Sequence, residues 1–275
     1  MAIVFDYAHW EAKLPELAAR YRSADPFPSI VLDDFVQPGA LKEALEAYPR
    51  LDDPQWTHYV HFNEKKLAQT KRELIPAPAL RVIDEFNSPR FLAFLSRLTG
   101  IEGLMADPSL EGGGLHQIRK GGFLNIHADF TAHPHQKHWA RRVNAIVYMN
   151  EDWKDEYGGH IQLWSTDAKR CVQKILPVFN RCLIFSTDPN SFHGHPEPLT
   201  CPEGRARKSM ALYYFSLADK PFTRSTEYKP RPDDPASKKA LIYLDKMALR
   251  AFDFAKRRLG LRNEWIGKLL RLLSK

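Results

Sequence analysis

The segment Phe123-Leu-Asn-Ile-His-Ala-Asp129 is one of a series of short β-rich runs in the middle of this sequence. From about Gly114 to Ser216, these runs are separated by Gly, Pro, Asn and Asp. The expected strands are Phe123–Asp129, Val143–Met149, His160–Trp164, Cys171–Ile175, Arg181–Ser186 and Lys208–Phe215. Many short strands at such spacing predict an antiparallel sandwich or jelly roll.

Two side chains of the first of these strands, His127 and Asp129, are candidate metal ligands. Residues i and i+2 of a strand face the same way, so both would point to the concave face of the sheet. His193, in a later β-rich run, would add a second imidazole. Two His and one carboxylate on one face of an octahedral ion leave three positions open, as non-haem Fe(II) chemistry requires. The alternative to a metal site is an ordinary half-exposed strand that carries two polar residues.

A second signal is Arg207-Lys-Ser209, at the start of the strand that ends Met210-Ala-Leu-Tyr-Tyr-Phe215. The period of a strand puts Arg207 and Ser209 on one face. A guanidinium matches a carboxylate in a bidentate pair and stays charged when buried. Arg207 and Ser209 are therefore candidates to hold the distal end of a dicarboxylate.

Together these residues resemble the Fe(II)- and 2-oxoglutarate-dependent dioxygenases, specifically the prolyl-hydroxylase branch that includes the hypoxia-factor and collagen prolyl hydroxylases. The resemblance runs from about Gln117 to Phe215. Arg141-Arg-Val-Asn-Ala-Ile-Val-Tyr-Met-Asn-Glu-Asp-Trp153, followed by Gly158-Gly159, is similar to the family's strand and turn between its metal motifs. Ile175-Leu-Pro-Val-Phe-Asn-Arg-Cys-Leu-Ile-Phe185 is similar to the family's approach to its distal His.

The resemblance implies a double-stranded β-helix and an enzyme that hydroxylates an unactivated C–H bond, with release of succinate and CO2. It implies Fe(2+), 2-oxoglutarate as co-substrate and O2, with ascorbate as an optional further reductant. It implies His127, Asp129 and His193 as the metal ligands. His195 competes with His193 for the distal position, and the spacing from Pro177-Val-Phe-Asn-Arg181 favours His193.

The resemblance also implies a set of residues that bind 2-oxoglutarate. Arg207 and Tyr148 correspond to the residues that hold its C5 carboxylate, and Ser209 is expected beside them. Ile161 corresponds to an apolar wall of the same site. Gln117, ten residues before His127, stands where relatives often have Tyr.

The interval between His193 and Arg207 is longer than is usual in the family, and several Pro and Gly residues mark an enlarged loop there. This leaves Arg205 as an alternative to Arg207. Asn125 is expected to face the metal site as a substrate contact or as an ordinary strand residue, and Tyr213 and Trp164 are expected in the core. The polar segment containing His133, His135 and His138 is expected to be a loop over the site.

Outside the β-rich region the sequence reads as helical, so the expected fold class is mainly β with flanking helices (α+β). Residues 1–110 are expected to form a helical support with one early strand, Ser29–Val36, a helix from Ala40 to about Tyr48, and a helix from Ser88-Pro89 to Gly100. Residues 111–220 are expected to form the catalytic core, in one domain with residues 1–110. Residues 221–275 are expected to form a Pro-rich connector, Pro221–Pro235, and a basic helical extension, Ala236–Lys275, with a break at Gly260.

The net charge of +7 arises in this extension. Residues 219–275 hold 15 Lys and Arg against 7 Asp and Glu, so they carry +8 and the remainder carries −1. Nucleic-acid binding is not expected, since no zinc-finger, helix-turn-helix or ribonucleoprotein pattern accompanies the charge. Trp265-Ile266, Leu269-Leu270 and Leu273 form one helical stripe. Such a basic amphipathic helix suits an anionic membrane surface or a protein partner, and packing on the domain's own helices is equally open.

The composition, 44% hydrophobic and 27% charged, excludes collagen, low-complexity disorder and a disulfide-stapled miniprotein. No apolar run approaches the ~18 residues of a membrane span. Three cysteines without C-x-x-C spacing favour a reducing compartment, and the amino terminus lacks a basic n-region. We expect a cytoplasmic protein with free thiols, either free in solution or peripheral at a membrane.

Several functions stay open at this point. The hydroxylated substrate is a prolyl residue, a free amino acid, a sugar or another small metabolite, because a fold does not determine a substrate. A zinc-dependent hydrolase would use the same three ligands with a bound water as the fourth. A jelly-roll binding module, whose basic tail recruits an anionic partner, is the non-enzymatic alternative. The pattern does not define an oligomeric state.

Overall fold

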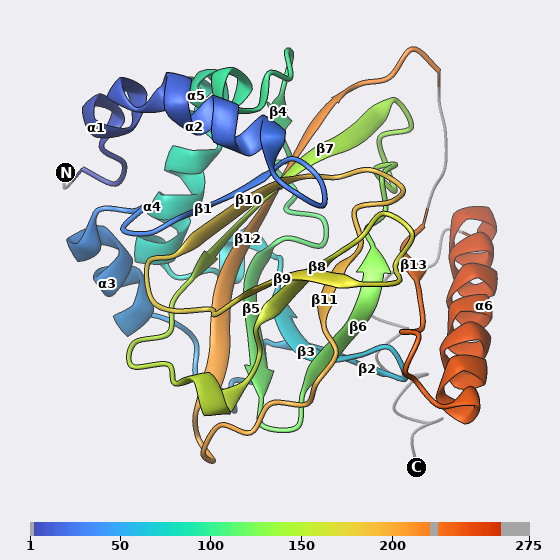
Figure 1. Cartoon of the computed structure of the whole chain (residues 1–275). Coiled ribbons are helices and arrows are strands. Elements are labelled where there is room, and N and C mark those ends of the chain that lie inside the picture. The colour runs from blue at the N-terminus through green and yellow to red at the C-terminus, as the bar shows by residue number, and fades with distance from the viewer. Residues whose placement is uncertain (1–2, 221–224, 260–275) are drawn as a thin grey trace.

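The computed structural model describes residues 3–220 and 225–259, and within them one curled, 13-stranded sheet forms the centre of the molecule (Figure 1). Its main path runs β1-β10-β7-β12-β5-β3-β6-β11-β8-β9. The strands are β1 (Ser29–Leu32), β2 (Thr57–His61), β3 (Glu64–Gln69), β4 (Met105–Ala106), β5 (Gly114–Arg119), β6 (Phe123–Ala128), β7 (Trp139–Tyr148), β8 (Ile161–Trp164), β9 (Cys171–Ile175), β10 (Cys182–Ser186), β11 (His193–His195), β12 (Ala206–Leu217) and β13 (Glu227–Tyr228). All pairings are antiparallel, and the predicted double-stranded β-helix is confirmed.

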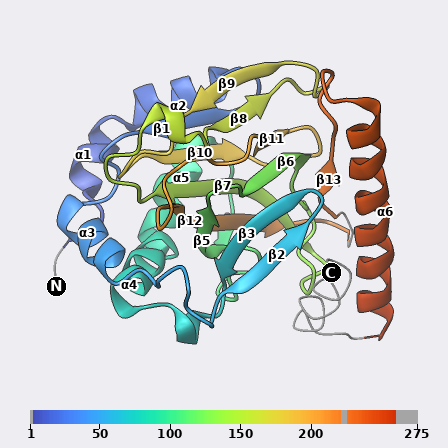
Figure 2. The ribbon, with the colours of Figure 1, turned by 90° about the horizontal axis from the view of Figure 1, so that it is seen from below.

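Among the described residues, the helices that precede β5 pack on one side of this sheet, and the helix that follows β13 lies at the opposite edge (Figures 1 and 2). The helices are α1 (Tyr7–Ala12), α2 (Leu14–Ser23), α3 (Pro38–Glu46), α4 (Ala77–Phe86), α5 (Pro89–Thr99) and α6 (Ala236–Leu259), with 3-10 turns η1 (Arg72–Leu74) and η2 (Asp155–Tyr157). The largest apolar cluster joins α1–α5 to β7, β10 and β12. Its aromatic centre contains Phe86 and Phe91, whose ring centroids are 4.5 Å apart.

The helix expected between Ser88 and Gly100 is confirmed as α5. The Ser88 hydroxyl accepts a hydrogen bond from the Phe91 amide, and Gly100 adopts φ +75 at the C-terminal end. The expectation of a single strand in residues 1–110 is wrong, because β2 and β3 form a hairpin and β3 joins the central sheet between β5 and β6. The early strand is also shorter than predicted and ends at Leu32.

The Pro-rich segment after β12 is more than a connector. Glu227 and Tyr228 form β13, which pairs with β6 at Ala128 and His127, and Tyr228 is buried. The expected helix then begins at Ala236. The predicted break at Gly260 and the stripe from Trp265 to Leu273 lie outside the described residues. Across residues 3–220 and 225–259, no helix is long and apolar enough to span a membrane.

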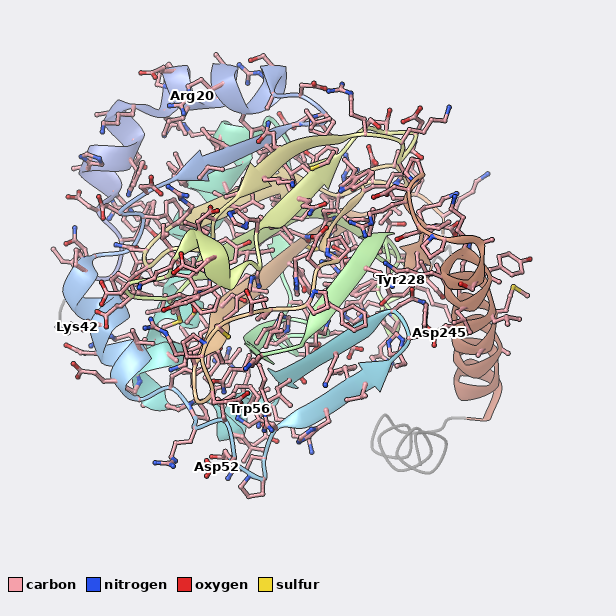
Figure 3. All side chains as sticks on the ribbon, turned by 60° about the horizontal axis from the view of Figure 1, so that its bottom comes forward. Arg20, Lys42, Asp52, Trp56, Tyr228 and Asp245 are labelled. Carbon is pink, nitrogen blue, oxygen red and sulfur yellow. The ribbon has the colours of Figure 1, made fainter. Side chains whose placement is uncertain are left out.

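A buried polar contact attaches α6 to the β2–β3 hairpin. Asp245 lies 2.8 Å from Nδ1 of His61 and accepts a hydrogen bond from the Asn63 amide, and Nε2 of His61 lies 3.0 Å from Glu64. Figure 3 shows Asp245 on the face of α6 that is turned toward the sheet. Burial alone lowers the pKa of His61, but its hydrogen bonds to Asp245 and Glu64 outweigh burial and raise the pKa to about 9.

This contact predicts that α6 is held less firmly at alkaline pH. Because the folded-state pKa of His61 is raised, its stabilising contribution is complete below about 6.5 and is lost as the pH rises through about 9. Hydrogen exchange of the α6 amides, corrected for intrinsic rates, should show protection falling across this window. In His61→Gln the protection should be low at both ends, whereas the exposed His9→Gln control should follow wild type. Equal protection in wild type and His61→Gln would contradict this role of His61.

Candidate active site

The structure brings His127, Asp129 and His193 together on the inner side of the curled sheet. His127 on β6 pairs directly with His193 on β11, and Asp129 follows the end of β6. Nε2 of His127 lies 3.4 Å from Oδ1 of Asp129, and Nε2 of His193 lies 3.4 Å from Oδ2. Among the described residues, these three form the group of ligand atoms within 4.8 Å of one another that is suited to a metal ion.

Backbone carbonyls orient both imidazoles. Nδ1 of His127 lies 2.8 Å from the carbonyl oxygen of Asn125, and Nδ1 of His193 lies 2.9 Å from that of Ser191. A carbonyl only accepts, so each Nδ1 carries the proton and each Nε2 keeps its lone pair. Burial, reinforced by the neighbouring His193, lowers the pKa of His127, which keeps it neutral. The Nε2 atoms of both rings therefore face the carboxylate of Asp129, as a metal site requires.

Two residues of β7 hold the carboxylate of Asp129. Oδ2 accepts hydrogen bonds from Nη2 of Arg141 at 2.8 Å and from the amide of Asn144 at 2.7 Å. The Arg141 guanidinium is buried and lies 3.3 Å from the ring centroid of Tyr213 and 4.6 Å from that of Phe130. Burial alone would raise the pKa of Asp129, but the charge of Arg141 and the two histidines hold it well below its usual value.

Sequence reasoning assigned no role to Arg141 or Asn144. The signal for Asn144 was available, because Asn144 lies on the same face of β7 as Ile146 and Tyr148 by the period of a strand. The signal for Arg141 is masked by a register shift between β7 and β12, which breaks the alternation at that end. Tyr213 was expected in the core, but it is only partly buried and covers Arg141.

Arg207 and Tyr148 form a second buried polar group on the same inner side. Nε of Arg207 donates to the carbonyl of Gly159 at 2.8 Å, and Nη2 donates to the Tyr148 hydroxyl at 3.4 Å. A Cβ on Gly159 would lie 2.9 Å from Cδ of Arg207, and its φ of +73 also favours glycine. The guanidinium of Arg205 instead bonds the carbonyl of Glu151 near the surface. The geometry thus favours Arg207 over Arg205 as the carboxylate-binding residue.

The remaining predicted residues separate into two groups. Ile161 packs in an apolar cluster with Tyr148, and Ser209 stands opposite Tyr148 in the β12–β7 pairing, so both accompany Tyr148. Gln117 pairs with Lys208, the residue before Ser209 on β12, and its side-chain amide donates to the carbonyl of Pro49. The structure therefore does not bring Gln117 to the site, because alternate residues of β5 face opposite sides.

His116, rather than Gln117, shares the face of Ser209. Sequence reasoning missed it, although it is one residue from the predicted position. His195 is buried beyond His193 and takes no part in the group of three ligand atoms. Trp164 is in the core as expected, packed with Ile126 and Phe192.

The side chains of Asn125 and His133 bond other residues, whereas Tyr228 lies beside a metal ligand. Asn125 turns to the β2–β3 hairpin, where its amide donates to Asn63 at 3.1 Å. The segment with His133 is a loop, as predicted, but His133 itself is buried and pairs with Asp107 at 3.4 Å. Tyr228 of β13 lies beside His127, with ring centroids 5.5 Å apart, at the edge of the sheet that faces α6 (Figure 3).

Comparison with known proteins agrees with this geometry. Residues 113–215 match the model of the 2OG-Fe(II) oxygenase superfamily. The prolyl 3-hydroxylase OGFOD1 of Mus musculus is 25% identical over 219 residues, which cover 77% of this chain and 36% of that protein. The chain thus spans about a third of the length of this curated relative.

Two solved structures share the fold. A prolyl-4-hydroxylase from Pseudomonas putida has a TM-score of 0.51 at 17% identity, covering 74% of this chain and 100% of that one. A prolyl hydroxylase from Trichoplax adhaerens, in complex with a peptide fragment of the hypoxia inducible factor oxygen degradation domain, has a TM-score of 0.55 at 18% identity, covering 76% and 91%.

The fold and the site define a jelly-roll protein with a His–Asp–His group suited to a metal ion. Residues 113–215 match the model of the 2OG-Fe(II) oxygenase superfamily, and the chain is similar to prolyl hydroxylases. Its residues fit the implied groups. Two Nε2 atoms and one carboxylate suit Fe(2+), and the buried Arg207–Tyr148 pair suits the distal carboxylate of 2-oxoglutarate.

The contacts of Asp129 predict that Asn144 tunes metal affinity. Replacing Asn144 with Ala removes one of the two donors to Oδ2 and frees the carboxylate to rotate, which should weaken metal binding about tenfold. Titration of the purified protein with Mn²⁺ measures this effect. Asn190→Ala, at an exposed position, is the matched control. Unchanged affinity in Asn144→Ala would show that Arg141 alone suffices to orient Asp129.

Proposed function

We propose that this chain is an Fe(II)- and 2-oxoglutarate-dependent oxygenase that hydroxylates a prolyl residue of a polypeptide. The observation that carries the oxygenase activity is the joint geometry of two buried groups. His127, Asp129 and His193 form a metal site with three ligand atoms, and Arg207 with Tyr148 lies on the same inner side of the sheet. A zinc hydrolase needs no buried arginine that can bind a dicarboxylate, so the Arg207–Tyr148 pair favours the oxygenase over the hydrolase.

The prolyl substrate is supported by the relatives. OGFOD1 is a prolyl 3-hydroxylase, and the Trichoplax enzyme is a prolyl hydroxylase captured with a peptide fragment. Aromatic groups from β12 and β13 flank the metal ligands, as binding of a peptide would require. Tyr228 lies beside His127, and Tyr213 covers Arg141, which bonds Asp129.

When bound, Fe(2+) would let O2 oxidise both 2-oxoglutarate, which leaves as succinate and CO2, and a C–H bond of the substrate, which becomes C–OH. The chain supplies position and electrostatics. Asp129 contributes the negative charge at the metal, and the neutral imidazoles complete one face. Arg207 would neutralise the distal carboxylate. Burial raises the pKa of the Tyr148 hydroxyl, so this hydroxyl stays protonated and can donate a hydrogen bond.

We also propose a reducing, cytoplasmic location. Cys171, Cys182 and Cys201 are free thiols, and Cys182 and Cys201 are buried. Burial raises the pKa of Cys182, so this thiol is protonated and unreactive at neutral pH.

The first test is the dependence of succinate production on Asp129. Asp129→Ala removes the anionic ligand, so Fe(II)-dependent succinate formation should be lost while circular dichroism shows a folded protein. Asp167→Ala, an exposed carboxylate remote from the metal ligands, should turn over like wild type. The metal assignment fails if Asp129→Ala makes succinate at the wild-type rate.

The second test separates Arg207 from Arg205. Arg207→Ala removes the buried charge that meets the co-substrate, so the Kd for 2-oxoglutarate should rise by roughly thirtyfold, or about 2 kcal/mol. Arg205→Ala should bind 2-oxoglutarate normally, because its guanidinium lies near the surface. Isothermal titration of metal-loaded protein gives both values. A loss confined to Arg205→Ala would reverse the assignment.

A further inference from the structure

Ring nitrogens of two histidines on the inner side of the sheet, the buried His195 and the half-buried His116, lack hydrogen-bond partners. Neither ring nitrogen of His195 has a partner among the described residues, and Nε2 of His116 has none. His195 is 2% exposed. The metal-site histidines differ, because a backbone carbonyl satisfies Nδ1 of each. Buried polar atoms are nearly always paired, so unpaired ring nitrogens beside a proposed ligand site point to the ligand as their partner.

The strand geometry sets the direction of His195. His193 and His195 are two residues apart on β11, so both side chains face the inner side of the sheet. Gly194 between them packs against β6, where an added Cβ would lie 2.8 Å from the carbonyl oxygens of Leu124 and Asn125. This close approach fixes β11 against β6 and with it the position of His195.

His116 approaches from the facing strands. The register places His116, Ser209 and Tyr148 in one row across β5, β12 and β7. Arg207 lies two residues before Ser209 on β12, so its side chain faces the same inner side. On the other side, Gly194 pairs with Gln162 of β8, so His195 stands next to Ile161, two residues from Gly159. The carbonyl of Gly159 accepts a hydrogen bond from Nε of Arg207, so His195 and Arg207 lie at the same end of the inner side.

The chemistry of these groups matches a carboxylate. Arg207 uses two of its five N–H groups on Gly159 and Tyr148, which leaves three for a ligand. A neutral imidazole offers one N–H donor, and carboxylate oxygens accept several hydrogen bonds. His195 is not needed as a metal ligand, since His127, Asp129 and His193 already form the group of three.

We propose that His195 donates a hydrogen bond to the distal carboxylate of the 2-oxo acid that Arg207 holds. The inference rests on the proposed function and names a specificity determinant within it. His195 makes the site select a 2-oxo acid with a distal carboxylate over one that ends in a methyl group. The partner that the ring nitrogens lack is thus the co-substrate.

The test compares two co-substrate probes of equal carbon number on zinc-substituted protein, because Zn²⁺ is redox-inert. Isothermal titration measures 2-oxoglutarate and 2-oxopentanoate, which lacks the distal carboxylate. In His195→Val, the Kd for 2-oxoglutarate should rise about tenfold, or about 1.4 kcal/mol, with the Kd for 2-oxopentanoate unchanged. His195→Gln, which keeps an N–H donor, should recover part of the loss. His138→Val, at an exposed histidine, should match wild type.

A second measurement does not depend on the stability of a variant. In wild-type protein labelled with ¹⁵N-histidine, the ring nitrogen signals of His195 should shift on addition of 2-oxoglutarate and stay in place with 2-oxopentanoate. Equal weakening of both probes in His195→Val, or His195 signals that ignore 2-oxoglutarate, would overturn the inference. Failure of wild-type protein to bind 2-oxoglutarate at all would instead overturn the proposed function.

Discussion

Asp129 carries its negative charge on the inner side of the sheet, where water cannot solvate it fully, and the structure around it is arranged to stabilise that charge. Arg141 and Asn144 both reach Oδ2 from β7, and Arg141 is itself almost completely buried. A buried charge is tolerated only when it is paired and hydrogen-bonded, so the pair constrains the position of β7 relative to the end of β6. Tyr213 on β12 and Phe130 then cover the guanidinium.

The same constraint acts on the histidines through the backbone. A metal ligand must present a lone pair, and the carbonyls of Asn125 and Ser191 ensure this by accepting the proton-bearing side of each ring. Asn125 and Ser191 each lie two residues before the histidine whose Nδ1 they bond, so the same local backbone geometry orients both rings.

Much of this site follows from local sequence, and the rest does not. The alternation of a strand was enough to bring His127 to Asp129 and Arg207 to Ser209. It was not enough for Gln117, which was placed at the site by counting ten residues back from His127 through a turn. That count is wrong by one residue, and a shift of one residue turns the side chain to the other face of the strand. The β2–β3 hairpin was missed because its strands mix charged and apolar residues, and only pairing with β5 and β6 stabilises them. Tyr228 lies in a Pro-rich stretch whose composition favours a linker, and its burial depends on a tertiary contact with β6.

The inner side of the sheet holds more polar groups than the metal requires, and their distribution has a consequence. Phe185 and the Ile161 cluster line it with apolar groups, whereas ring nitrogens of His116 and His195 remain without partners among the described residues. Unpaired buried donors destabilise the protein alone and favour whatever ligand satisfies them. Binding affinity for a dicarboxylate is therefore obtained by leaving donors unsatisfied in the free chain. An apolar residue at position 195 would make the chain more stable and less selective.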